Sequence, residues 1–434
     1  MYLVESIQQF ESFLRMFESE DSFCIPILLD SRKHPIENEA SLLYFKLLDS
    51  RKSYMLPMNH SETTISNYPL VDNSKTIYTP DKKALLQIYF LKFQNVIDVG
   101  ILNHFMNNNS LDFLEMDTTS HNFFYARQYP NDNRLIPIVK HFEKCEKIFD
   151  SVIETILQTK DLVGDKSFTF FNELVLDTLS NIESSGINTV DGMKYSQYNI
   201  YTSTGRPSNR FGGVNYAAMS KEDGSRKKIV SRFKDGKMLM FDYDAYHLRL
   251  IAKLINYNFP KDISVHEYLG KQYFGKDKLT EEEYGKSKEV SFRLLYGGID
   301  KEFENIPFFK AVKKYIFSLW ANYKNDGYIE SAIAGKKLYF NNVEGINPQK
   351  IFNYMIQLYE TEQNMMVSKK VFEFLSKLRT RFIMYTYDSF LFDVYSPEMP
   401  SVLKKIKDIL ECNNDFPVRS YTGSSYDDIK LINT

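Results

Sequence analysis

The segment 237–255, KMLMFDYDAYHLRLIAKLI, constrains the fold more than any other part of the chain. Its run MLMF is continuously apolar, which is typical of a strand buried on both faces. The following residues, AYHLRLIAKLI, repeat apolar side chains at helical spacing and predict an amphipathic helix. Asp242 therefore stands where a core strand ends, and its carboxylate either caps the helix or points into a functional site.

A second carboxylate lies at an equivalent point later in the chain. In RFIMYTYDSFLFDV, residues 381–394, two apolar and aromatic halves flank Asp388 and predict a β-hairpin with an acidic tight turn. An aspartate is common in turns because it bonds its own backbone. Two acids at two strand ends also suit a two-metal site, in which carboxylates hold hard divalent ions about 3.5–4 Å apart. The pair alone leaves both interpretations open.

A third segment, LTEEEYGKSKEVSFRLLYGGID, predicts a helix with defined ends. Thr280 and Glu283 have the spacing of a capping box, and two glycines provide the stop. Three side chains at four-residue intervals share one face of this helix: Lys288, Phe292 and Tyr296. A cation followed by two aromatic rings suits a nucleoside triphosphate, with the ammonium on the phosphates. The alternative is an aromatic stripe in the core with the lysine extending to solvent.

Composition limits the classes of protein to which the chain can belong. With 54 Lys+Arg against 56 Asp+Glu in 434 residues, the net charge is −2, so binding to a polyanion has to be local. The three cysteines form no CxxC pair, which argues against a zinc site or a disulfide framework. The first 20 residues predict an amphipathic helix instead of a signal peptide. No uncharged apolar run reaches about 18 residues. We therefore expect a soluble, cytoplasmic protein with no membrane partner.

The N-terminal part predicts a small mixed domain followed by helices. SFCIPILLD, ASLLYFKLLDS and KSYMLPM predict strands, and LLQIYFLKFQNVIDVGILNHF mixes strand and helix signals. From about residue 134 to 183, apolar residues recur at three- and four-residue spacing. Strands and helices then alternate to the end of the chain, which predicts an α+β body.

Three segments together resemble family A DNA polymerases, the DNA polymerase I group. FDYDAYHLR, KEVSFRLLYGG and YTYDSF occur in the order and approximate spacing of that family's three polymerase motifs, and the resemblance covers roughly residues 190–434. It implies a right-hand polymerase with palm, fingers and a shortened thumb. The segments MKYSQYNIYTSTGRPSN and NYMIQ resemble the family's flanking DNA contacts. Any one motif is weak, but the ordered set is specific.

The resemblance implies a role for each matching residue. Asp242 and Asp388 would hold two Mg²⁺ ions, for which Mn²⁺ could substitute, and Lys288 would stabilise charge on the phosphates of the incoming dNTP. Further nucleotide contacts would come from Phe292, Tyr296, Gly297, His247 and Tyr243. Primer–template DNA would be contacted by Arg206, Asn353, Gln357, Tyr387 and Arg249. Asp244 would be a cap or a solvated neighbour.

Some positions depart from the family pattern. His247 stands where the family usually has a glutamate that discriminates against a ribose 2′-OH, which puts sugar selectivity in doubt. Tyr284 replaces an arginine that contacts the triphosphate, Tyr387 replaces a histidine near the primer terminus, and Gln349 replaces another arginine. Each change removes a charge or a familiar donor, so we expect modest rate or fidelity.

The N-terminal part resembles, weakly, the 3′–5′ exonuclease domain of the same family, an RNase H-like α/β domain. The acidic pair of its first strand is broken, because Arg32 follows Asp30 where a second acid is needed, although Asp98 matches the second exonuclease motif. We therefore expect absent or very weak proofreading. The expected domains are a degenerate exonuclease-like domain (1–125), a helical thumb-like region (126–190) and palm with fingers (191–434).

The leading hypothesis is a template-directed DNA polymerase that adds deoxynucleotides to a primer 3′-OH. The short thumb predicts weak duplex grip and a processivity factor. The compact chain, rich in Lys, Asn, Tyr and Phe, suggests a bacteriophage replication enzyme acting in the host cytoplasm. Two alternatives stay open: a single-subunit RNA polymerase or primase-like nucleotidyltransferase, motivated by His247, and a catalytically silent DNA-binding accessory protein.

Overall fold

The computed structural model describes residues 1–30, 32–64, 68, 74–88, 93–107, 132–202, 204–260, 263–340 and 343–432. The chain divides into two compact units. The first unit comprises Met1–Asn188, Gly192–Tyr201 and Ser208–Met219, and the second comprises Thr189–Asp191, Thr202–Pro207 and Ser220–Thr434. The expected boundary at residue 125 lies outside the described residues. The division into 1–125, 126–190 and 191–434 stays a prediction.

The first unit contains a six-stranded mixed sheet with the order β1-β4-β3-β2-β5-β6. Its strands are β1 (Tyr2–Leu3), β2 (Ser22–Leu28), β3 (Ala40–Leu47), β4 (Ser53–Pro57), β5 (Ile77–Thr79) and β6 (Val96–Asp98). The strands β2, β3 and β4 pair antiparallel, whereas β5 and β6 extend the sheet in parallel. The three strands predicted from SFCIPILLD, ASLLYFKLLDS and KSYMLPM are confirmed as β2, β3 and β4.

Helices of the first unit supply its core. They are α1 (Ile7–Phe17), α2 (Lys82–Gln87), α3 (Val99–Asn107), α5 (Ile138–Thr159), α6 (Lys166–Thr169) and α7 (Leu176–Ser185), with a π-helical turn at Phe170–Val175. The predicted N-terminal helix is confirmed as α1, whose Phe13 ring packs 5.2 Å from Phe45 of β3. On α5, the Phe149 ring packs 5.5 Å from Phe23 of β2. The sheet is therefore buried by aromatic side chains from both helices.

The second unit contains a five-stranded antiparallel sheet with the order β15-β16-β12-β17-β18. Its strands are β12 (Lys237–Tyr243), β15 (Arg381–Thr386), β16 (Ser389–Val394), β17 (Val418–Gly423) and β18 (Lys430–Ile432). The core strand predicted from MLMF is confirmed as the central strand β12. The predicted hairpin is confirmed as β15 and β16, joined by a two-residue turn.

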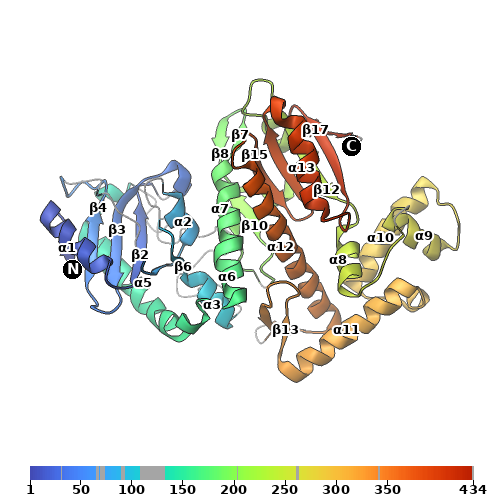
Figure 1. Ribbon diagram of the computed structural model, residues 1–434, viewed down its shortest axis with the longest axis horizontal. Coiled ribbons are helices and arrows are strands. Elements are labelled where there is room, and N and C mark those ends of the chain that lie inside the picture. Colours follow the sequence, from blue (N-terminus) through green and yellow to red (C-terminus); the bar gives the residue numbers. More distant parts are fainter. Residues whose placement is uncertain are drawn as a thin grey trace. The chain divides into compact units, whose positions relative to one another are not determined.

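Six helices and a small hairpin accompany this sheet among the described residues. The helices are α8 (Tyr246–Leu254), α9 (Val265–Phe274), α10 (Glu281–Gly297), α11 (Pro307–Asp326), α12 (Pro348–Leu375) and α13 (Met399–Glu411), and the hairpin is β13 (Tyr328–Glu330) with β14 (Lys337–Tyr339). Short strands lie between the two large sheets in sequence: β7 (Ile187–Thr189), β8 (Gly192–Lys194), β9 (Tyr198–Asn199), β10 (Ser208–Phe211) and β11 (Val214–Asn215). The long helix α12 contacts α8, α10, α11 and α13 and runs beside the sheet (Figure 1).

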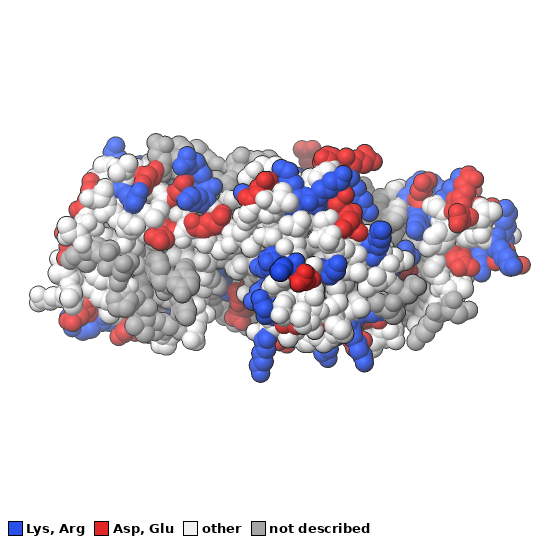
Figure 2. Space-filling model, turned by 90° about the horizontal axis from the view of Figure 1, so that it is seen from above, with Lys and Arg blue, Asp and Glu red and all other residues white. Residues whose placement is uncertain are grey.

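Charged side chains of both signs share the surface. On the face seen in Figure 2, Lys and Arg side chains are interspersed with Asp and Glu, as a net charge of −2 leads one to expect. Within the described ranges, none of the helices has both the length and the apolar character needed to cross a bilayer.

Candidate active site

Asp242 occupies the outer end of the central strand of the second unit. Phe241 and Tyr243 are buried on one face of β12, and Asp242 points to the opposite face because side chains alternate along a strand. Its neighbours across the two ladders are Ser389 of β16 and Arg419 of β17. Burial raises the pKa of Asp242 to about 6, the Asp388 carboxylate adds to this increase, and Arg419 opposes it. The structure therefore brings the two predicted acids into electrostatic contact.

Asp242 does not cap the helix that follows it. Helix α8 begins after Ala245, which has φ 53° and makes no side-chain capping bond. Asp244, two residues beyond Asp242, forms an ion pair with Arg419 and lies 3.7 Å from the guanidinium of Arg249. Capping therefore does not explain either carboxylate.

Asp388 lies at the turn between β15 and β16. The preceding residue, Tyr387, has φ 61°, a left-handed conformation that favours glycine and is strained for a tyrosine. The Asp388 backbone oxygen accepts a 3.0 Å hydrogen bond from the amide of Tyr243, which ties the turn to the end of β12. Desolvation raises the pKa of the Asp388 carboxyl and Glu360 raises it further, whereas its own backbone N–H, His247 and Arg206 lower it.

Helix α10 carries the predicted stripe. The capping box of Thr280 and Glu283 is present, and the helix ends at two glycines, of which Gly297 is exposed and Gly298 has φ 109°. Lys288 Nζ lies 4.8 Å from the centre of the Tyr284 ring. The rings of Phe292 and Tyr296 are nearly parallel with centroids 6.3 Å apart, and half of the Phe292 surface is exposed. A phenylalanine with half of its surface exposed is available to a ligand and is not part of the core.

His247 connects α10 to α12. Its Nε2 lies 2.9 Å from Oε1 of Glu360, and its Nδ1 is hydrogen-bonded to the Tyr296 hydroxyl. The other oxygen of Glu360, Oε2, lies 2.7 Å from Nε of Arg206, and the Arg206 guanidinium stacks 3.6 Å above the Tyr387 ring. We call Arg206, His247, Tyr296 and Glu360 the Glu360 network.

Helix α12 presents a polar stripe beside this network. Asn353 Nδ2 donates to the backbone oxygen of Tyr296 at 3.4 Å, and Gln357 Oε1 accepts from the hydroxyl of Thr204 at 3.1 Å. About two helical turns beyond Gln357, Asn364 donates to the backbone oxygen of Tyr387 at 2.7 Å. The predicted DNA-contacting residues Arg206, Asn353, Gln357 and Tyr387 are thus brought together, with Gln349 hydrogen-bonded to Asn353.

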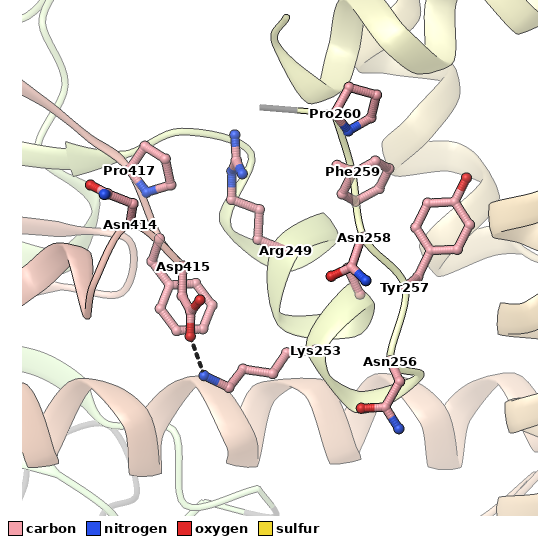
Figure 3. A pocket seen from close by; sticks show the side chains of 12 residues that line it. Arg249, Lys253, Asn256, Tyr257, Asn258, Phe259, Pro260, Asn414, Asp415 and Pro417 are labelled. Atoms are coloured by element: carbon pink, nitrogen blue, oxygen red, sulfur yellow. Dashed lines mark hydrogen bonds and ion pairs between the residues drawn. The ribbon is translucent and has the colours of Figure 1, made fainter. Parts of the chain in front are cut away.

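The side chains of Tyr243, a predicted nucleotide contact, and Arg249, a predicted DNA contact, are already engaged with other parts of the second unit. The Tyr243 side chain is buried, stacks 4.0 Å from the Tyr246 ring and donates its hydroxyl to the backbone oxygen of Leu410. A nucleotide could therefore meet only the backbone of Tyr243. Arg249 donates to the backbone oxygen of Asp244 and lines a pocket of about 530 Å³ between the end of α8 and the loop before β17. Figure 3 shows this pocket, with the ion pair of Lys253 and Asp415 across it.

Sequence reasoning missed two charged residues of the site, Glu360 and Arg419. Glu360 follows Gln357 by three positions and Asn353 by seven, so the stripe on α12 carries a signal for it. Arg419 occurs in an ordinary strand sequence and is recognisable only from its pairing with Asp242.

The site is suited to hard divalent cations. Asp242 and Asp388 offer oxygen ligands, and each carries a pKa raised by burial and a neighbouring carboxylate. A bound cation would remove that repulsion. Within the described ranges, no three His, Cys, Asp or Glu side chains are grouped closely enough to hold a metal ion by themselves. A divalent cation held by this pair would need its remaining ligands from elsewhere, as Mg²⁺ does when one or two carboxylates hold it together with substrate phosphates.

The two carboxylates that match the exonuclease motifs, Asp30 and Asp98, are both occupied by hydrogen bonds from other residues of the first unit. Both oxygens of Asp30 accept 3.0 Å bonds from the Arg32 side chain. Asp98 is buried and accepts from the amides of Lys82 and Ile101 and from the hydroxyl of Tyr201. Asp98 therefore begins α3 as a structural cap.

Comparison with known proteins identifies the fold. No protein-family model matches the sequence. Among solved structures, the chain is similar to the POL domain of Pol1 from M. smegmatis in complex with DNA primer-template and dNTP. The TM-score is 0.74 at 13% identity, covering 98% of this chain and 100% of that chain. The chain has the fold of a DNA polymerase domain. The predicted α+β class is confirmed.

Proposed function

We propose that the protein is a template-directed, Mg²⁺-dependent DNA polymerase that adds deoxynucleotides to a primer 3′-OH. The observation that carries this proposal is the juxtaposition of Asp242 and Asp388 within a polymerase-like fold: Asp242 pairs with Ser389, the residue after Asp388, and Tyr243 donates to the Asp388 backbone oxygen. The solved structure described above is a complex with DNA primer-template and dNTP, which supports the same two partners for this chain.

Asp242 and Asp388 would hold the metal ions, and Mn²⁺ could replace Mg²⁺. When bound, such ions lower the pKa of the primer 3′-OH and neutralise the triphosphate and the leaving pyrophosphate. Lys288 would place an ammonium against the phosphates, where it stabilises the negative charge that develops as pyrophosphate leaves. Lys288 would also protonate the leaving group.

The remaining residues would orient the substrates. Phe292 would meet the sugar, and Tyr296 with Gly297 the nascent base pair, while His247 would stand beneath the sugar. Arg206, Asn353, Gln357 and Tyr387 would contact the primer–template, and Arg249 would lie near the template path. Three of these side chains are already held by hydrogen bonds: His247 to Glu360, Asn353 to the backbone oxygen of Tyr296, and Gln357 to the hydroxyl of Thr204. These bonds support a preorganised site, which lowers the cost of ordering substrates.

The resemblance further supports a right-hand arrangement. In this proposal, 191–434 forms palm and fingers, 126–190 a shortened thumb and 1–125 a degenerate exonuclease-like domain without proofreading. The engagement of Asp30 by Arg32 and the capping role of Asp98 support the loss of proofreading. A short thumb favours dependence on a processivity factor, and the compact chain suits phage replication.

The alternative of RNA synthesis rests on His247. Its ring is held on both sides by Tyr296 and Glu360, so it still offers bulk against a 2′-OH and favours deoxynucleotides. Single-nucleotide extension of a primed DNA template, with dNTPs and rNTPs supplied separately, distinguishes the two. Preference for dNTPs supports the proposal, and preference for rNTPs moves the function to RNA synthesis. Absence of extension by folded protein that still binds DNA favours the silent accessory protein.

A further inference from the structure

Glu360 is a buried carboxylate with no assigned role. It lies on α12, its exposed fraction is 0%, and its two oxygens meet two different segments of the second unit. Oε1 is 2.9 Å from His247 Nε2, on α8, and Oε2 is 2.7 Å from Arg206 Nε, in the segment Thr202–Pro207. A single side chain thus holds one predicted nucleotide-contacting residue and one predicted DNA-contacting residue.

Stability alone does not account for such an arrangement. Burying a carboxylate is costly, and replacing a buried ion pair by apolar residues is often neutral or stabilising. The neighbouring positions on α12 show that the helix accepts apolar side chains, since Ile356, Leu358 and Met365 are all buried there. A charge at Glu360 therefore indicates a requirement for orientation, a use for which buried polar groups are known.

The contacts of Glu360 fix the His247 ring. Because the carboxylate only accepts hydrogen bonds, Nε2 of His247 carries the proton toward Glu360. The opposite nitrogen, Nδ1, is hydrogen-bonded to the Tyr296 hydroxyl at the C-terminal end of α10. A ring bonded at both nitrogens cannot rotate about its Cβ–Cγ bond without breaking both contacts, so Glu360 determines where His247 and Tyr296 stand.

The second oxygen fixes Arg206 in the same way. The Arg206 guanidinium is held between Glu360 and the face of Tyr387, the strained residue directly before Asp388. A cation over an aromatic ring is favourable, and the ion pair limits the rotamers that the arginine can adopt. Glu360 therefore also sets the position of the group that stands beside the hairpin turn.

We infer that Glu360 is a positioning residue that aligns His247 with Tyr296 on the nucleotide side and Arg206 on the DNA side, and thereby sets discrimination between deoxyribonucleotides and ribonucleotides. The inference rests on the proposed polymerase function. Glu360 reaches neither substrate itself and acts through the two side chains that it holds. Removing its charge loosens both at once, which a residue with a merely structural role would not do.

The test compares Glu360→Gln with the matched control Glu362→Gln. Glu362 is a fully buried glutamate of the same helix whose carboxylate accepts a 3.1 Å bond from the amide of Ile333, away from the Glu360 network. Single-nucleotide insertion is measured with dNTPs and rNTPs, together with primer–template affinity. For Glu360→Gln, we expect KM for dNTP to rise about tenfold with a smaller change in kcat, and the dNTP-to-rNTP ratio of kcat/KM to fall about tenfold.

The outcomes separate this inference from the proposed function. For the control Glu362→Gln, we expect KM for dNTP and the dNTP-to-rNTP ratio of kcat/KM to stay within about twofold of the wild type. The same result for folded Glu360→Gln would overturn the positioning role and leave the polymerase assignment intact. Wild-type protein that incorporates neither kind of nucleotide overturns the polymerase proposal and this inference with it. If Glu360→Gln does not fold, Glu360→Asp keeps the charge but shortens its reach, and the same loss of discrimination is expected.

Discussion

Asp242 and Arg419 lie directly opposite each other in the antiparallel pair of β12 and β17. Opposed residues in such a pair share one face of the sheet, with Cβ atoms about 4.5–5.5 Å apart. The guanidinium lowers the pKa of Asp242, against the larger effects of burial and of Asp388, and the pKa still lies at about 6. Asp242 is thus a carboxylate that is poised to lose its proton when a cation binds.

The first prediction concerns pH. Because metal binding requires the ionised carboxylate, Mg²⁺ affinity and extension rate should fall as the pH falls through about 6. Arg419→Gln removes the group that lowers the pKa of Asp242, so the acid limb of the rate profile should move to higher pH. Profiles of kcat/KM between about pH 5 and 9 measure the shift. Arg381→Gln, at an exposed arginine at the start of β15, should leave the profile in place. An unmoved profile in Arg419→Gln would contradict the coupling.

The second prediction concerns stability without metal. The folded-state pKa of Asp242 exceeds the unfolded value, so the folded protein binds this proton more tightly, and stability falls as the pH rises from about 4 to about 6. Asp242→Asn should therefore raise the free energy of unfolding at pH 7 by about 1–2 kcal/mol in EDTA, with no gain at pH 4. Thermal melts at the two pH values provide the check. Equal changes in the free energy of unfolding at pH 4 and pH 7 would show that ionisation of Asp242 is not the cause.

The third prediction separates two lysines on α10. Lys288→Ala should lower kcat by about 10²-fold, because a cation aimed at the phosphates is lost. Lys286→Ala is the matched control, since Lys286 is exposed and forms an i,i+4 ion pair with Glu282. Its kcat should stay near the wild-type value. Pre-steady-state incorporation distinguishes the chemical step from product release, and equal losses in both variants would remove the special role of Lys288.

The fourth prediction is the absence of proofreading. A 5′-labelled primer with a mismatched 3′ end should not be shortened in Mg²⁺, because Asp30 is held by Arg32 and Asp98 caps α3. Arg32→Glu restores the acidic spacing but leaves Asp98 engaged, so it should not create exonuclease activity. Trimming of the mismatched end by the wild type would show that the described contacts rearrange when DNA binds.

The sequence predicts those parts of the structure that depend on local periodicity. MLMF and RFIMYTYDSFLFDV predict the central strand and the hairpin, and Thr280 with Glu283 predicts the start of α10, since strand alternation and capping are local patterns. The two carboxylates are found in the same way, as acids at strand ends. What these patterns leave open is which strand ends meet.

The residues that were missed are defined by long-range contacts. Glu360 is 113 positions from His247, and Arg419 becomes significant only when β17 pairs with β12. The burial of Tyr243 is likewise decided by Tyr246 and α13, which its own segment does not reveal. The positive φ of Tyr387 is not predictable from a turn sequence that lacks glycine, because tertiary contacts maintain it.

The most direct test of the account is primer extension on a DNA template with Mg²⁺ and dNTPs, comparing the wild type with Asp242→Asn and Asp388→Asn. Asp244→Asn serves as the neighbouring control, because the Asp244 carboxylate is held in an ion pair with Arg419 and is not one of the two proposed metal ligands. We expect primer extension by the wild type and by Asp244→Asn, and loss of extension in Asp242→Asn and Asp388→Asn. Extension that persists in folded Asp242→Asn or Asp388→Asn would contradict the assignment of the metal-binding carboxylates.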